Sequence, residues 1–72
     1  MNTWEEAQAA VLTGTQTTWQ DDWANLNEGL VLYQGSIWLA GDTYISQFTP
    51  TPAQENATNW VIAAFDGSLP PR

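Results

Sequence analysis

The segment LVLYQGSIWLAGDTYISQF, residues 30–48, carries the strongest strand pattern in the chain. Its apolar and aromatic residues form short runs, which are separated by the dipeptides Gly35-Ser36 and Gly41-Asp42. Glycine-containing pairs between such runs favour tight hairpin turns. We therefore expect an antiparallel meander of three strands, at residues 30–34, 37–40 and 43–48.

A helix is expected before this meander, over NTWEEAQAAVLTG at residues 2–14. Thr3 is a good N-cap, and Glu6 stands three residues later, which completes a capping box. Gly14 supplies the C-terminal stop. Helical spacing places four apolar residues on one face, namely Trp4, Ala7, Ala10 and Val11.

Between this helix and the meander, the threonine-rich segment TQTTWQ at residues 15–20 is typical of a strand. Residues 21–29 have the composition of a loop.

A second, short helix is expected after the meander. Thr51 caps it, Pro52 suits its first turn, and Gln54 completes another capping box. The apolar segment WVIAAF, residues 60–65, predicts a last strand buried on both faces.

The order of elements predicts one α+β domain over residues 1–66, followed by a tail at residues 67–72. Its small antiparallel sheet has an N-terminal helix and a second short helix before the last strand.

The composition excludes several classes of protein. The 72 residues include no cysteine, no histidine and no lysine, and Arg72 is the only cation in a chain of net charge −7. Such a charge repels nucleic acid and anionic lipid. No apolar run approaches 18 residues, and the acidic N-terminus does not resemble a signal peptide. We expect a cytoplasmic protein that binds neither membranes nor nucleic acid.

Catalysis is not expected, and neither is a metal or a cofactor. Asp21 and Asp22 are the only adjacent aspartates, and neighbouring residues of an extended chain point to opposite sides. The serines have no histidine partner, and no glycine-rich phosphate loop is present. We predict a binding protein without catalytic residues.

The candidate binding segment is TTWQDDWANLNEG, residues 17–29. The polar neighbours of its two tryptophans allow two interpretations. In one, one ring closes the edge of the core and the other is half exposed. In the other, both rings form a platform on which a flat base stacks, while nearby amides contact its polar edge. The predicted ligand-binding residues are Trp19, Gln20, Trp23, Asn25, Asn27 and Tyr44. Trp4 and Trp60 are predicted in the core, and Trp38 in the core or at a subunit interface.

Four short motifs follow one another in a distinctive order: Glu6-Ala7, Gly14, QDDW at residues 20–23 and ATNW at residues 57–60. This order resembles the second type of Thoeris anti-defence sponge, a family of small phage proteins. That family has an E-A pair in an N-terminal helix, then a glycine, a strand, R-x-x-W, a meander and A-x-D-W before a last strand. The resemblance spans residues 2–64.

The resemblance implies an α+β protomer that assembles into dimers or tetramers. It also implies binding, without cleavage, of a cyclic nucleotide immune signal of the cyclic ADP-ribose type in the host cytoplasm. The chain departs from the family at Gln20, which replaces the arginine, and at Asn59, which replaces the aspartate. The family's basic strand residues are also missing. A phosphate would then depend on Arg72 of a neighbouring subunit or on backbone amides after Thr51.

Two other functions stay open. The acidic charge also suits an inhibitor that binds a basic groove of a host nuclease or polymerase, and such binding weakens as salt rises. A structural phage protein without a ligand is the third hypothesis.

Overall fold

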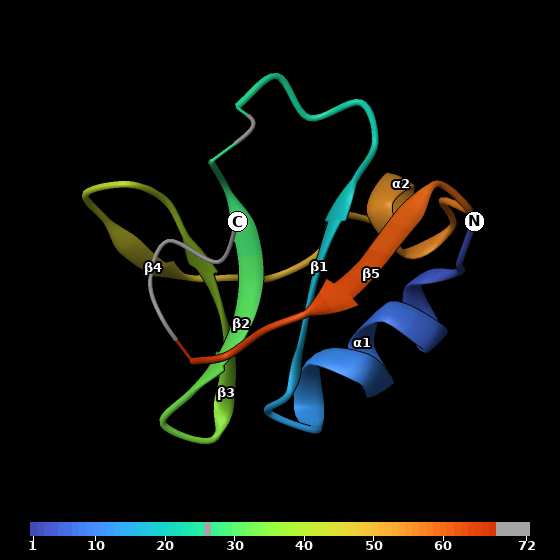
Figure 1. Cartoon of the computed structure of the whole chain (residues 1–72). Coiled ribbons are helices and arrows are strands. Elements are labelled where there is room, and N and C mark those ends of the chain that lie inside the picture. The colour runs from blue at the N-terminus through green and yellow to red at the C-terminus, as the bar shows by residue number, and fades with distance from the viewer. Residues whose placement is uncertain (26, 68–72) are drawn as a thin grey trace.

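The computed structural model describes residues 1–25 and 27–67 (Figure 1). Within these residues, two helices and five strands follow one another: α1 (Trp4–Leu12), β1 (Gln16–Gln20), β2 (Gly29–Tyr33), β3 (Ser36–Ala40), β4 (Ile45–Gln47), α2 (Pro52–Glu55) and β5 (Trp60–Ala64).

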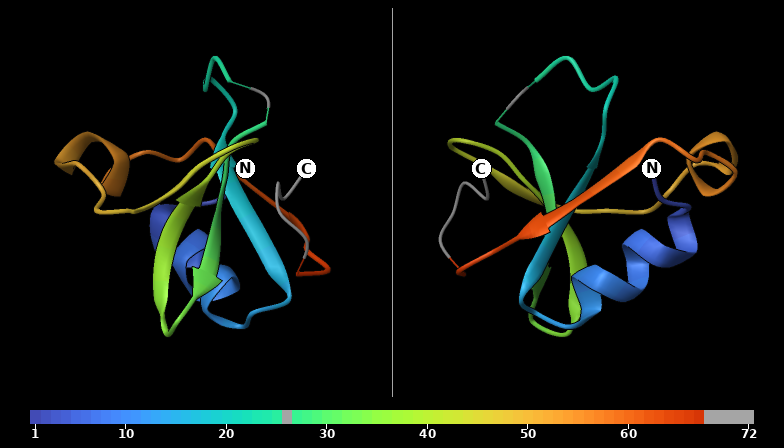
Figure 2. Two further views of the ribbon diagram at one scale, coloured as in Figure 1. Left: turned by 90° about the vertical axis from the view of Figure 1, so that its left-hand side faces the viewer. Right: turned by 45° about the vertical axis from the view of Figure 1, so that its right-hand side comes forward.

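The strands form one sheet in the order β4-β3-β2-β1-β5, and all neighbouring pairs are antiparallel. Both helices lie on the same side of this sheet (Figure 2). The α+β class, the N-terminal helix and the short helix before the last strand are therefore as predicted.

Local hydrogen bonds define the two ends of α1 as the sequence predicts. The Thr3 N–H donates to Oε1 of Glu6 at 3.0 Å, and the Glu6 N–H donates to Oγ1 of Thr3 at 3.3 Å. After the helix, Gly14 takes a φ of 80°, a left-handed conformation that favours glycine. The buried residues of α1 are the predicted four, Trp4, Ala7, Ala10 and Val11.

The core lies between α1 and the sheet, and Trp60 is at its centre. This side chain is fully buried, and its ring centroid lies 4.9 Å from that of Trp4 and 6.0 Å from that of Trp23. Burial of such a side chain removes on the order of 200 Å² from water, which stabilises the fold by at most about 5 kcal/mol. The predicted core positions of Trp4 and Trp60 are confirmed.

The first hairpin turn lies one residue earlier than predicted. Tyr33 pairs with Ser36, so the turn consists of Gln34 and Gly35, with φ of 51° and 78°. Two successive positive φ angles match the twist of a hairpin, and glycine accepts the second of them at no steric cost. Ser36 therefore belongs to β3.

The third strand of the meander is shorter than predicted. Residues 41–44 form a turn, which the Gly41 N–H closes by donating to the Tyr44 carbonyl at 2.9 Å. Strand β4 therefore begins only at Ile45, and Tyr44 lies outside it.

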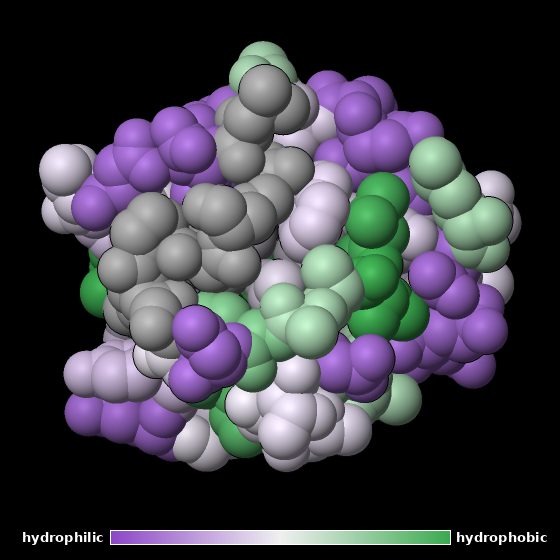
Figure 3. Space-filling model, in the orientation of Figure 1, coloured by the Kyte–Doolittle hydropathy of each residue, from purple (hydrophilic) through white to green (hydrophobic). Residues whose placement is uncertain are grey.

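The last strand was predicted to be buried on both faces, and this prediction was wrong. Strand β5 is an edge strand that pairs with β1 alone among the named strands. Trp60 is buried, but Val61, Ile62 and Ala63 are half-buried and Ala64 is exposed. Hydrophobic surface gathers over this strand in Figure 3. The apolar run of residues 60–65 therefore forms a strand at the edge of the sheet and not in its interior.

Most of the predicted tail, at residues 68–72, lies outside the described residues. Within the described residues, no helix combines the length and the apolar character needed to cross a membrane.

Candidate functional site

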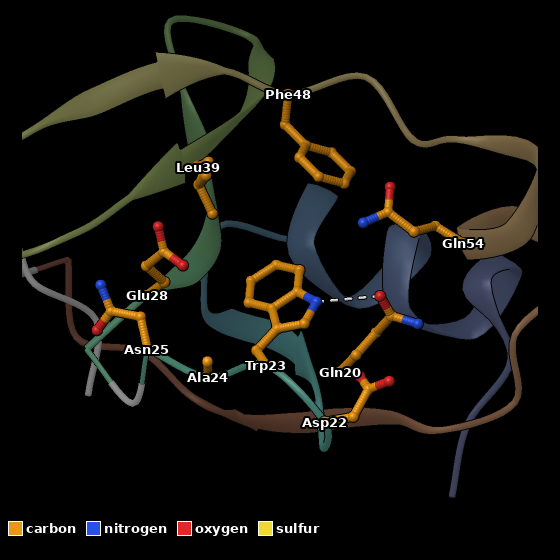
Figure 4. Close-up of a pocket in the computed structure, with 9 residues that line it drawn as sticks. All are labelled: Gln20, Asp22, Trp23, Ala24, Asn25, Glu28, Leu39, Phe48 and Gln54. Atoms are coloured by element: carbon orange, nitrogen blue, oxygen red, sulfur yellow. Dashed lines mark hydrogen bonds between the residues drawn. The ribbon is translucent and has the colours of Figure 1, made fainter.

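A cleft of about 520 Å³ opens beside Trp23. The loop after β1, strand β3, the segment after β4 and the helix α2 all contribute to it (Figure 4). Pockets that hold small ligands measure roughly 300–1,000 Å³, so the cleft has the size of a small-molecule site. The residues important for its chemistry are Gln20, Trp23, Asn25, Glu28, Phe48 and Gln54.

Trp23 is half-buried and borders both the core and the cleft. It packs edge-on against Trp60, with an interplanar angle of 75°. Its Nε1–H donates to Oε1 of Gln20 at 3.0 Å. In Figure 4 the ring of Phe48 points towards this indole from the opposite side of the cleft. Packing and a hydrogen bond thus fix the indole in one orientation beside open space.

Gln20 links this indole to the last strand. It is only 8% exposed, and its Nε2 donates to Oδ1 of Asn59 at 3.0 Å. Asn59 in turn donates through Nδ2 to Oδ1 of Asp21 at 2.8 Å. Both functional groups of Gln20 are therefore engaged within the protein, and its geometry is that of a positioning residue for Trp23. We call Gln20, Asn59 and Asp21 the amide end of the cleft.

A second network ties the loop of residues 21–28 to the turn between β3 and β4. The Tyr44 hydroxyl donates to Oε2 of Glu28, and Nδ2 of Asn27 donates to Oδ2 of Asp42 at 3.0 Å. The hydrogen bond to Glu28 is the largest cause that raises the pKa of Tyr44 above its usual value of 10.0. We call Asn25, Asn27, Glu28, Asp42 and Tyr44 the loop end.

Five of the six predicted binding residues divide into two groups, and Trp19 is separate from both. Gln20, Trp23 and Asn25 line the cleft. Asn27 and Tyr44 are not among its lining residues, and they connect the two loops instead. Tyr44 therefore does not extend the aromatic wall, because it belongs to a turn and not to a strand facing the cleft.

Trp19 lies on the other side of the sheet. It pairs with Val61, whereas its neighbour Thr18 pairs with Leu30, a core residue beneath α1. Successive residues of a strand point to opposite faces, so Trp19 faces away from α1 and from the cleft. The expectation of a shared platform of Trp19 and Trp23 is thus wrong, because the chain leaves the strand between them.

Trp38 shares the face of Trp19. It pairs with Val31 and packs edge-on against Tyr33, with a centroid distance of 5.5 Å. It is half-buried, and its buried Nε1 has no hydrogen-bond partner among the described residues.

The sequence did not identify Glu28, Phe48 and Gln54 as residues of the site. Phe48 follows β4 and packs on Trp4, 6.0 Å between ring centroids. Gln54 was expected only as a capping residue, which it also is. The positions of Phe48 and Gln54 beside Trp23 depend on how the segment after β4 crosses to β5, and no local pattern encodes that path.

The charges in the cleft are negative. Asp22 and Glu28 line it, and no lysine or histidine occurs anywhere in the sequence. Of the backbone amides after Thr51 that were expected to replace a cation, Pro52 has no N–H, and the Gln54 N–H already donates to Thr51 Oγ1 at 3.2 Å. Within the part of the chain described, no group of three or more acidic, histidine or cysteine side chains forms a metal site.

The arrangement offers a fixed indole face, a phenyl ring and several oxygen acceptors around one opening. Such a surface suits a flat, polar ring that stacks on the indole and donates hydrogen bonds from its edge. No protein-family model, curated protein or solved structure matches the chain.

Proposed function

We propose that the protein binds and sequesters a cyclic nucleotide signal of the cyclic ADP-ribose type, without cleaving it, in the cytoplasm of a phage-infected cell. The observation that carries this proposal is the cleft beside Trp23, in which a hydrogen bond to Gln20 at 3.0 Å holds an indole next to open space. A base stacked on such a ring gains roughly 1–3 kcal/mol.

The resemblance to the anti-defence sponges gains support from a pair of residues. The chain departs from that family at Gln20 and Asn59, and these two side chains hydrogen-bond to each other at 3.0 Å. The family's arginine and aspartate, placed at the same two positions, would form an ion pair. Two departures that compensate for each other favour a shared architecture, because a single change would leave one partially buried polar group without its partner.

An assembly of two or four copies belongs to the same proposal. A chain of 72 residues has a small core, and association would add buried surface. The hydrophobic surface over β5 is one area that such an assembly would cover.

The direct test is native mass spectrometry of the purified protein with cyclic ADP-ribose isomers and, separately, cyclic dinucleotides. We expect a complex at micromolar concentrations, and we expect the ligand to be recovered intact after the protein is denatured. Recovery of a cleaved product would contradict sequestration.

A matched pair of variants makes the test specific to the cleft. Trp23→Leu removes the indole that lines the opening, whereas Trp19→Leu removes an indole from the opposite face. Because the stacking surface is lost, we expect Trp23→Leu to bind the ligand at least about tenfold more weakly than the unmodified protein. We expect little change in affinity for Trp19→Leu. Equal losses in the two variants would count against the cleft as the binding site.

The second candidate function is inhibition of a host nuclease or polymerase through its basic groove. It is favoured by the net charge of −7 and by acidic side chains that are exposed at Glu5, Glu6, Asp42 and Glu55. Binding of a basic protein weakens as salt rises. Binding of an anionic nucleotide to this acidic protein strengthens with salt, because screening reduces the repulsion. The sign of the salt dependence therefore separates the two functions.

A further inference from the structure

The chemistry of the cleft places limits on which part of a nucleotide enters it. Asp22 and Glu28 contribute carboxylates, and none of the described residues that line the cleft is a cation. A phosphate inside the cleft would meet two like charges without a compensating group, which is strongly unfavourable in a partly desolvated site. The phosphates of a bound nucleotide must therefore remain on the solvent side.

The flat face of the cleft is fixed, so the entering group is a ring. Trp23 packs against Trp60 at a centroid distance of 6.0 Å and donates to Gln20 at 3.0 Å, so its orientation does not depend on a ligand. Phe48 points towards it (Figure 4), and its own ring is supported by Trp4. Two supported aromatic side chains therefore border the opening, and the indole offers its face to a flat ring.

Among the polar residues beside this ring, Glu28 is the one on which recognition of the ligand depends. Figure 4 shows Glu28 and Asn25 at one end of the cleft, beyond the indole. The hydroxyl of Tyr44 donates to Oε2 of Glu28, which ties the carboxylate to the turn of residues 41–44. A carboxylate has about four acceptor sites, so several groups can donate to it at once.

A carboxylate accepts hydrogen bonds and donates none. It accepts a hydrogen bond from the exocyclic amino group of adenine, whereas a purine that carries only hydrogen at that ring carbon offers it no such donor. Hydrogen bonds to a charged group are among the stronger ones, so this difference discriminates between the two kinds of edge.

We infer that the cleft selects an amino-substituted purine, whose amino edge meets Glu28 while its sugar and phosphates face solvent. This inference rests on the proposed function, and it assigns the base as the recognised part of the signal. Specificity then comes from one carboxylate at the loop end and not from contacts to phosphate.

The test compares adenosine with purine riboside, which differ only in that hydrogen replaces the amino group of adenosine. Titrations followed by the Trp23 indole N–H signal in ¹H–¹⁵N NMR spectra detect weak binding and locate it in the cleft. We expect adenosine to shift this signal at millimolar concentrations and purine riboside to bind at least about tenfold more weakly. This comparison uses the unmodified protein and depends on no variant.

Glu28→Gln then tests the residue itself. The amide retains an acceptor for Tyr44 but lacks the negative charge that strengthens the hydrogen bond from the amino group. We expect the preference for adenosine over purine riboside to fall to within about twofold. The matched control is Glu5→Gln, which removes the same charge from an exposed position in α1 and should leave the preference unchanged.

A third comparison tests the orientation of the ligand. AMP and ATP should bind no more tightly than adenosine at low salt. The differences in affinity among the three ligands should shrink at 1 M salt, where screening limits the range of electrostatic repulsion to about 3 Å.

The outcomes separate this inference from the function on which it rests. Equal binding of adenosine and purine riboside, or an unchanged preference in Glu28→Gln, overturns the inference while sequestration stands. The same holds if cyclic ADP-ribose binds but neither nucleoside shifts the Trp23 signal. If neither the nucleosides nor any cyclic nucleotide binds, both proposals fall.

Discussion

The two ends of the cleft are built differently. At the amide end, Gln20 is a strand residue that is 8% exposed, and it bonds to Trp23 and Asn59 at 3.0 Å each. At the loop end, Tyr44 is 44% exposed, and its contact with Glu28 joins a loop to a turn. The amide end is therefore part of the folded framework, while the loop end can adjust at little cost in stability.

This difference assigns a separate task to each end. A rigid end that holds the indole preorganises the stacking surface, which reduces the entropy lost on binding. A loop end that carries the carboxylate can close on a base after it has entered. We expect substitutions at the amide end to change the free energy of unfolding, and substitutions at the loop end to change binding.

The largest effect is expected for Gln20→Leu. This change leaves the Trp23 indole N–H and the Asn59 side-chain oxygen without their partner, which costs about 2 kcal/mol of the free energy of unfolding. Urea unfolding followed by tryptophan fluorescence measures it.

The control for Gln20→Leu is Glu28→Leu at the loop end, for which we expect a change within about 0.5 kcal/mol. Equal losses at the two ends would remove the distinction between them.

A double-mutant cycle at Gln20 and Asn59 is expected to show the next largest effect. Gln20→Arg alone places a guanidinium against an amide in a partly buried site, and Asn59→Asp alone sets a carboxylate beside Asp21. The double variant pairs the guanidinium with a carboxylate, so we expect a favourable coupling energy of about 1 kcal/mol. Thermal unfolding of the four proteins gives this energy.

A coupling energy near zero would show that the two positions do not compensate for each other. The resemblance to the sponge family would then lose the support of this pair.

The sequence predicted the framework better than the cleft because the framework follows local rules. Capping boxes at Thr3 and Thr51, the apolar stripe of α1 and the meander all depend on residues close together in the chain. The burial of β5 was misjudged because an apolar run cannot show whether a strand lies inside a sheet or at its edge.

The cleft was predicted only in part for a related reason. Composition pointed to the amides and indoles of residues 19–27, and of these Gln20, Trp23 and Asn25 line the opening. Trp19 lies on the other face of the sheet because of its position in the alternation of β1. A shift of one residue in the register of that strand would place its side chain on the opposite face. The approach of Phe48 depends on the path of the chain after β4.

Gly41→Ala is expected to have a small effect on stability and a clear effect at the loop end. A Cβ at this position would lie 2.7 Å from the Tyr44 hydroxyl oxygen and within the contact distance of its ring. Because this side chain is 44% exposed, it can move into solvent, so the expected loss is within about 0.5 kcal/mol.

The measurement for Gly41→Ala is an NMR spectrum of the tyrosine ring together with the adenosine titration. We expect the ring to leave Glu28 and the adenosine affinity to fall. An unchanged affinity would show that Tyr44 does not help to position the carboxylate. Gly35→Ala in the distant hairpin is the control, since a Cβ there meets nothing within 4 Å, although its positive φ adds backbone strain.

The smallest effect is the pH dependence that Tyr44 contributes. Its hydrogen bond to Glu28 raises the pKa of the phenol above 10.0, so the folded state favours the protonated form. The contribution to stability is therefore fully present below pH 10 and is lost as the pH rises through the raised pKa. A titration of the ring by NMR or by absorbance at alkaline pH measures this pKa directly.

The same titration distinguishes the loop end from the rest of the surface. In Gly41→Ala the pKa of Tyr44 should return towards 10.0, because the displaced ring loses its hydrogen bond to Glu28. In Glu28→Gln it should fall only in part, because the amide still accepts the hydrogen bond but carries no charge. Gln20→Leu should leave this pKa raised, because the amide end shares no hydrogen bond with Tyr44. If Gln20→Leu also lowers it, the two ends of the cleft are coupled through the loop of residues 21–28, and the rigid end controls the position of the carboxylate as well as that of the indole.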